Sequence, residues 1–413
     1  CSSDLLKLAG GTIFDVTGTL TMNSPAILYQ EANGLSDVGI SAREIYLVNT
    51  TGADGALSHT ENKGRLALNA KETIGIGYGD IYLGGFNTID MESKDEEVFG
   101  DILLRGKGSF VTDGDLTFTA ARVISSFYEN VDTERDQASF ESTRFWVQAG
   151  NSQAGYKTIS IIGNGSPDPA GRSFGGTLDF VGKSIHLSGG GILASGGWVT
   201  LTAHDDAAGG QGITLSDSAF IDVSGNEYAP GGRVTLSSDA GAIVIGNDSL
   251  IDVSAGVQGD AGIIKLLSPK AEIRIDGEII GHAAGGTGGA LYMDSRQISE
   301  ADVAPLLDTL ANGGFDYRID LRLRTGNFKL AQENTLHANQ VKITADGGDV
   351  LIEGIINASG PSGGNVEINA GNELALVKDS WIIASADEYK ADAGSVYLNA
   401  VNINFEEGST ITV

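Results

Sequence analysis

A short phrase recurs along this chain and limits what the chain can fold into. Residues 220–224 read FIDVS, and after a loop two glycines lead into the segment RVTL. The same order returns at 250–254 as LIDVS, so Ile221 and Ile251 lie 30 residues apart. A repeat of this length indicates stacked structural units, each of which buries its apolar side against the next.

Further, less regular copies of the phrase stand on both sides. They include 192–195 (ILAS), 279–283 (IIGHA), 355–359 (IINAS) and 382–385 (IIAS). The step from the third to the fourth is shorter than 30 residues, so the strand segments keep the pattern while the loops vary in length. Strands this short and this closely spaced leave no room for crossover helices, and matching aliphatic positions favour stacked internal ladders. The sequence therefore predicts an all-β chain, a parallel β-helix or β-solenoid.

Glycine and chain length agree with a repeat array. The 413 residues hold 59 glycines and only 7 prolines, as expected for many tight bends between short strands. A repeat array needs no internal boundaries because each unit contacts only its neighbours. We therefore expect a single β-helical domain over residues 1–413.

Two stretches interrupt the pattern. Residues 124–173 mix acidic and aromatic side chains, and we interpret them as a β-rich excursion from the rod, a hairpin or an irregular loop. Residues 298–314 contain a serine, early acidic residues, leucines at helical spacing and a final glycine pair. This second stretch predicts a short lateral helix from about Glu300 to Ala311, with Pro305 near its start.

Charge restricts the partners of the chain. There are 54 acidic and 26 basic residues, so the net charge is −28 and would repel phosphate backbones. We expect no nucleic-acid partner, and no apolar run is long enough for a transmembrane segment. The single cysteine, Cys1, excludes an internal disulfide. The start at residues 1–4 (CSSD) resembles a mature lipoprotein, although chance or a processing boundary explains it equally well.

The repeated phrase, together with LRLRTGN at 321–327, resembles the filamentous-haemagglutinin-like large exoproteins of Gram-negative bacteria. The resemblance covers most of the chain and is clearest over 175–413. It implies a right-handed parallel β-helix that a two-partner system exports through an outer-membrane secretion partner. The Asn-Pro-Asn signatures of the family's secretion domain do not occur in these residues.

The function that this resemblance implies is structural or adhesive. We expect an extracellular rod-like scaffold or filament subunit at the bacterial cell surface, which mediates adhesion or matrix and fibre formation. Its partners would be glycans or proteins of a host or neighbouring cell. Neither end of the sequence has the appearance of a cap, so either the chain is cut from a longer one or copies associate end to end or laterally.

A carbohydrate-active enzyme, a polysaccharide lyase or glycoside hydrolase, is the alternative, because parallel β-helices often host such enzymes. The hydrolases of this fold resemble one another in an Asp-Asp pair and a Gly-His-Gly element. In this chain the nearest match to the pair is His204-Asp205-Asp206, and Gly281-His282-Ala283 departs from the histidine element. Adjacent aspartates in a glycine-rich bend are typical of a turn rather than of an acid–base pair. No catalytic residue is assigned, and we expect no enzymatic activity.

Three acidic turns offer oxygen ligands for a structural Ca²⁺: 113–115, 346–349 and 204–206. None has the spacing of a calcium β-roll or an EF-hand, and turn chemistry alone also explains them. We therefore assign no metal ligands and expect no other cofactor. The scattered histidines are expected at ordinary surface or rung positions: His59, His186, His204, His282 and His337. The three tryptophans are expected to cover the side of the rod, or else to stack on sugars: Trp146, Trp198 and Trp381.

Overall fold

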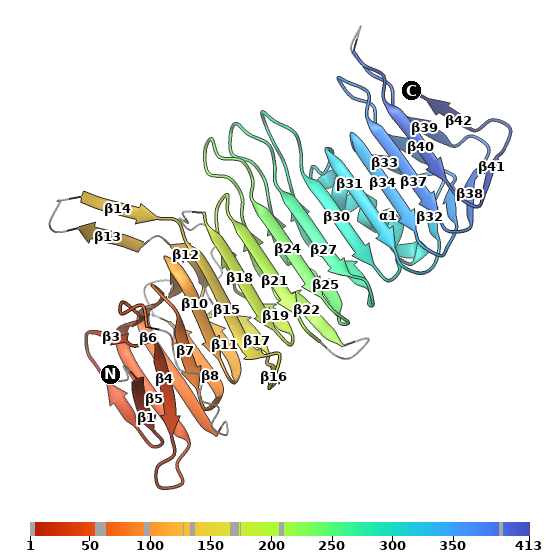
Figure 1. The fold of residues 1–413 in the computed structure, drawn as a ribbon. Helices are drawn as coiled ribbons and strands as arrows, with labels where there is room; N and C mark the ends of the chain where they lie inside the picture. Colours follow the sequence, from red (N-terminus) through yellow and green to blue (C-terminus); the bar gives the residue numbers. More distant parts are fainter. Residues whose placement is uncertain are drawn as a thin grey trace. The chain divides into compact units, whose positions relative to one another are not determined.

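The computed structural model describes residues 5–53, 63–94, 100–126, 128–132, 137–165, 173, 175–205, 210–387 and 391–413. Within these residues nearly all regular structure is β-strand, in long parallel sheets, with one α-helix (Figure 1). This confirms the all-β prediction and fits a parallel β-solenoid. The chain divides into two compact units: Cys1–Asp205, Gly212–Val223 and Gly246–Leu250 form the first, and Asp206–Gln211, Ser224–Ile245 and Ile251–Val413 form the second. The expectation of one domain over 1–413 stays a prediction.

The first unit contains two parallel sheets. One comprises β1 (Leu5–Ala9), β4 (Ala26–Gln30), β7 (Ile81–Gly84), β10 (Lys107–Thr112), β15 (Arg144–Asn151), β18 (Thr177–Gly182) and β21 (Trp198–Ala203). The other comprises β2 (Ile13–Asp15), β3 (Thr19–Asn23), β5 (Asp37–Val48), β6 (Gly64–Ile76), β8 (Phe86–Ser93), β9 (Asp101–Arg105), β11 (Asp115–Thr119), β12 (Arg122–Ser126), β17 (Ile159–Ile162), β19 (Ile185–Ser188), β20 (Gly191–Leu193), β22 (Gln211–Ser216) and β23 (Phe220–Asp222).

The predicted excursion at 124–173 contains strands of two kinds. An antiparallel hairpin of β13 (Tyr128–Asp132) and β14 (Gln137–Glu141) departs from the parallel arrangement. In contrast, β15 and β17 pair in parallel with their neighbours, and the short β16 (Gly155–Tyr156) folds back on β15.

The second unit repeats one sequence of strands. One sheet comprises β24 (Arg233–Ser238), β27 (Ile263–Ser268), β30 (Ala290–Ser295), β31 (Arg318–Leu323), β34 (Gln340–Ala345), β37 (Asn365–Ala370) and β40 (Ser395–Asn399). After most of these strands the chain forms two shorter ones before it returns to this sheet. The shorter strands are β25 (Ala242–Ile245), β26 (Leu250–Asp252), β28 (Ile273–Ile275), β29 (Glu278–Ile280), β32 (Phe328–Leu330), β33 (Thr335–His337), β35 (Val350–Ile352), β36 (Ile355–Asn357), β38 (Glu373–Leu376), β39 (Trp381–Ile383), β41 (Asn402–Phe405) and β42 (Thr410–Thr412).

The core of the second unit is a set of aliphatic ladders. Ile264 pairs with Leu291, which pairs with Ile319, and the row continues through Val341 and Val366. All five side chains are buried. Every second residue of a strand points inward, and successive strands place equivalent residues above one another. The inward residues therefore form continuous rows that build the core. Each fully buried side chain of this kind contributes roughly 1.5–3 kcal/mol.

The predicted helix is present as α1 (Glu300–Asn312). β30 and β31 pair directly, so α1 occupies the place where other turns of the chain form their two short strands. It buries Val303, Leu306, Leu307 and Leu310 and contacts β29, β32 and β33. Ser299 stands at the expected cap position, but its hydroxyl donates to Asp302 Oδ2 (2.5 Å) instead of capping a backbone N–H.

Candidate ligand-binding site

The acidic turn at 113–115 is part of the protein's own hydrogen-bond network. Asp113 is buried, and its Oδ2 accepts hydrogen bonds from the Tyr82 hydroxyl (2.8 Å) and the Gly85 N–H (3.0 Å). Burial, together with the bond to Asp113, raises the pKa of Tyr82. Asp115 Oδ1 accepts the Thr158 N–H (2.8 Å). These oxygens therefore stabilise the turn and its neighbouring strands.

The turn at 346–349 is engaged in the same way. Asp346 accepts from the guanidinium of Arg322 through both carboxylate oxygens, at 3.0 to 3.2 Å. Asp349 Oδ1 accepts from Asn372 Nδ2 (2.7 Å) and the Glu373 N–H (3.1 Å). Among the described residues, no group of three or more His, Cys, Asp or Glu side chains is arranged to hold a metal ion.

The histidine motif at 204–206 lies partly outside the described residues, because Asp206 is not among them, and neither is His59. The His204 ring stacks on Tyr156 with ring centres 4.3 Å apart, and Asp205 is buried. His186 Nδ1 lies 2.6 Å from the Thr214 hydroxyl, and burial lowers the pKa of its imidazole.

The three tryptophans are half-exposed and lie apart in the chain's strands. Trp146 stands on β15, Trp198 on β21 and Trp381 on β39, and each residue is 41–53% exposed. None of them lines the two grooves described below. Their stacking on sugars stays a prediction.

A groove of about 650 Å³ crosses the loops of the second unit that lead into its largest sheet. We call it the loop groove. Its floor is formed by Asp316 and Tyr317, before β31, and by His337 and Asn339, before β34. One wall is residues 286–288, and the other comprises Asn357, residues 359–361 and Asp387. This volume lies within the range of small-ligand pockets.

Unequal loop lengths create this groove. Residues 281–289 form a long loop before β30, and 358–364 form another before β37. Between them the chain turns tightly, with only residues 338–339 separating β33 from β34. Figure 1 shows the long loops of the second unit extending beyond β24 and β27. The short turns therefore become a floor between two taller walls.

Backbone hydrogen bonds hold both walls. On one side the Ala261 N–H donates to the Thr287 carbonyl (2.9 Å), and the Thr287 N–H donates to Asp260 Oδ1 (2.8 Å). That backbone bond is the main reason why the pKa of Asp260 is lowered. On the other side the Asp387 N–H donates to the Gly360 carbonyl (2.8 Å). The loops of both walls are thus held by bonds within the protein, and ordering a loop in advance reduces the entropy lost on binding.

The floor offers polar groups and an aromatic ring. Tyr317 is 38% exposed, and its hydroxyl accepts a hydrogen bond from Gln340 Nε2 (3.3 Å). The Asp316 carboxylate lies against Gly288, where any Cβ would come within 2.0 Å of Oδ1. A glycine at 288 therefore allows the Asp316 carboxylate to lie this close to the wall.

Carboxylates on this sheet are paired, but the one carboxylate of the floor, that of Asp316, is not. Asp294 binds Arg324 and Asp320 binds Arg318, whereas within the described chain no hydrogen bond or ion pair engages the side chain of Asp316. The same holds, over the described residues, for His337 and Asn339. The floor therefore keeps hydrogen-bonding groups available to a ligand.

The sequence patterns did not single out Asp316, Tyr317, Asn339 and Asp387 as residues of one groove, and they placed His337 among ordinary positions. A signal was available in the spacing of the repeats. A two-residue turn between longer loops predicts a depression on a solenoid, since stacked loops of unequal length leave a step.

Comparisons with protein-family models, curated proteins and solved structures found no match to this chain. Among the described residues no helix has the length and apolar character needed to span a bilayer.

Proposed function

We propose that this chain is a right-handed parallel β-helix that acts outside the cell, at a bacterial surface, as an adhesive scaffold whose loop groove binds glycans of a host or neighbouring cell. The in-register parallel strands and the family resemblance of the repeats support the fold. The loop groove supports the binding activity.

The observation that carries this proposal is the combination of groups on the groove floor. An exposed tyrosine ring suits the apolar face of a sugar, and Asp316 and Asn339 offer oxygens that accept bonds from its hydroxyls. Such pockets combine aromatic surface with a few convergent polar groups. A neutral glycan fits better than an anionic one because Asp316 and Asp387 are both acidic.

Adhesion also suits a stiff scaffold. A single groove of this type binds weakly, and many copies on one cell surface raise the overall avidity. Export through an outer-membrane partner, and self-association of the chain into fibres, belong to the same proposal.

A glycan screen followed by titration tests the binding activity. We expect a neutral oligosaccharide to bind wild-type protein and Tyr317→Ala to weaken it about tenfold, equivalent to about 1.4 kcal/mol. Tyr228→Ala is the matched control, because Tyr228 is 69% exposed on a loop of the same unit outside the groove. Equal affinity of both variants and wild type would rule out this site.

A glycoside hydrolase or lyase is the second candidate, because Asp316, Asp387 and His337 line one groove. Hydrolysis of a glycosidic bond usually needs two carboxyl groups. Incubation with the bound oligosaccharide separates the two functions. New chain ends that disappear in both Asp316→Asn and Asp387→Asn indicate an enzyme, whereas binding without cleavage indicates an adhesin.

A further inference from the structure

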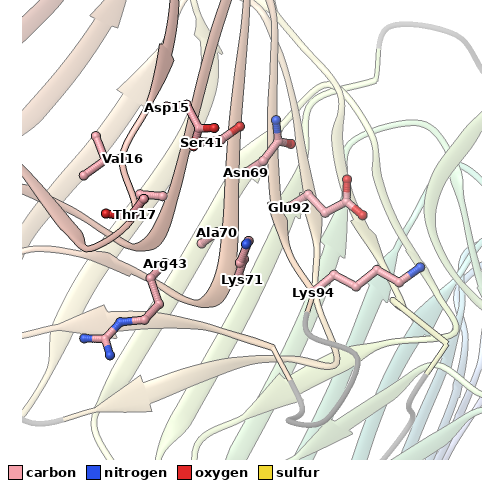
Figure 2. Close-up of a pocket in the computed structure, with 11 residues that line it drawn as sticks. Asp15, Val16, Thr17, Ser41, Arg43, Asn69, Ala70, Lys71, Glu92 and Lys94 are labelled. Atoms are coloured by element: carbon pink, nitrogen blue, oxygen red, sulfur yellow. The ribbon is translucent and has the colours of Figure 1, made fainter.

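A second groove lies in the first unit, at a corner of its larger sheet, and has a volume of about 390 Å³. Strands β5 and β6 pass through this corner without a break. Their first halves pair with β2 and β8, and their second halves pair with β3 and β9. The register between β5 and β6 shifts between Ala42 and Glu44, where Lys71 and Glu72 of β6 lie opposite the single residue Arg43, so the bulge is on β6. We call this hollow the corner groove (Figure 2).

One wall of the corner groove is a row of oxygen-bearing side chains. Asp15 pairs with Ser41, Ser41 with Asn69, and Asn69 with Glu92, so four successive strands each contribute one residue. Figure 2 shows these four side chains side by side. All four can accept hydrogen bonds.

The other wall is a row of cations. Arg43, Lys71 and Lys94 each stand two residues beyond a member of the first row, and alternate residues of a strand point to the same face. Between the two rows lie Ala42 and Ala70, which are buried. The corner groove is therefore positive along one side and rich in acceptors along the other.

These groups are available to a ligand. Arg43 has only long contacts, 3.7 Å to Glu44 and 3.9 Å to Glu72, with its side chain 52% exposed, and such surface pairs contribute little. Lys71 and Lys94 have no ion pair with any described residue. Elsewhere in the same unit, Arg65 is paired with Asp90 at 2.9 Å.

The negative charge of the whole chain does not cancel this local row. At physiological ionic strength the Debye length is about 8 Å, so distant carboxylates are largely screened while cations in contact with a ligand are not. In a chain with a net charge of −28, three cations on neighbouring strands, two of them without an ion pair to any described residue, are unusual.

We propose that the corner groove binds a linear polysaccharide of uronic acid residues. Its carboxylates contact Arg43, Lys71 and Lys94, and its hydroxyls donate to the row from Asp15 to Glu92. Neighbouring strands lie about 4.8 Å apart and each contributes one cation, so the cations follow one another along the groove, which suits a polymer with one carboxylate on each sugar. A polyphosphate chain fits poorly, because it has no hydroxyls to offer Asp15 and Glu92. This site is independent of the neutral-glycan site proposed for the loop groove.

Titration of the full chain with trigalacturonate, galacturonate and inorganic polyphosphate tests the proposal. We expect the trimer to bind and the monomer to bind far more weakly, because only the trimer spans all three cations. Replacing both lysines, in Lys71→Ser/Lys94→Ser, should weaken the trimer about tenfold or more. Lys183→Ser/Lys270→Ser changes the net charge equally at exposed positions outside the groove and should leave affinity unchanged.

A second pair of substitutions examines the acceptor row. Asp15→Asn/Glu92→Gln keeps oxygen acceptors and removes two charges, so it should retain trimer binding and allow polyphosphate to bind. Equal losses in the groove and control lysine variants, equal affinity for monomer and trimer, or tight polyphosphate binding by wild type would each overturn the proposal. Tyr317→Ala should leave trimer binding intact, because Tyr317 lines the loop groove. Its effect distinguishes failure of the corner-groove site from failure of the loop-groove site.

Discussion

In the recurring phrase, the polar residue at the end of the short strand bonds to the backbone of the loop that follows. Asp252 Oδ1 accepts the Ser254 N–H (2.8 Å), and Asn357 Oδ1 accepts the Ser359 N–H (3.0 Å) in a later copy. An aspartate or asparagine two residues before the bonded N–H is the signature of an Asx-turn. The polar residue of the phrase therefore ends the strand and starts the loop.

His186 gives a prediction for pH dependence. Burial lowers the pKa of its imidazole below 6.5, so the folded state favours the neutral ring. The neutral ring therefore contributes to the free energy of unfolding above the pKa that His186 has in the unfolded chain. This contribution is lost as the pH falls through the lower pKa of the folded state. We expect the wild-type urea midpoint to fall between neutral pH and about pH 5 more than that of His186→Gln. Parallel pH profiles for the two proteins would contradict this.

At the scale of elements, α1 shows how a solenoid accepts a helix. The helix stands where two short strands would otherwise lie, and it still delivers apolar side chains to the adjoining strands. The Gly313 carbonyl accepts the Gly281 N–H (2.7 Å), so the end of the helix is joined to the preceding turn of the chain.

Removing a core contact of this helix should be costly. Leu310 is 1% exposed, so Leu310→Ala leaves a cavity and should cost about 2–5 kcal/mol. Asp308→Ala, at an exposed position of the same helix, should change stability by less than about 0.5 kcal/mol. Urea denaturation followed by tryptophan fluorescence and circular dichroism measures both. Similar midpoints for the two variants would show that α1 does not contribute to the core.

At the scale of the whole molecule, surplus negative charge opposes folding. Acidic residues outnumber basic ones by 54 to 26, and the ion pairs at the surface are individually weak. We expect the thermal midpoint to rise by about 2 °C or more when sodium chloride is raised from low to physiological concentration. A protein that depends on its surface ion pairs would respond in the opposite direction, so a fall in the midpoint would refute this account.

The strand class and the position of the helix could be predicted because they depend on local patterns. Alternating aliphatic residues, glycine bends and the leucine spacing at 300–312 act over a few neighbouring positions. The grooves could not be predicted in the same way. Asp15, Ser41, Asn69 and Glu92 are far apart in sequence, and only the pairing of their strands makes them one row.

The sequence by itself determined that this chain forms stacked short strands, because its period and its inward aliphatic residues permit little else. Only the tertiary structure decided which polar groups are available to a ligand. The turns at 113–115 and 346–349 are rich in acids, yet neighbouring strands supply their hydrogen-bond donors. Asp316 and Lys71 look ordinary in the sequence, but strand register and loop length leave both beside open grooves. Register and loop height arise from contacts between successive turns of the chain, which no local pattern encodes.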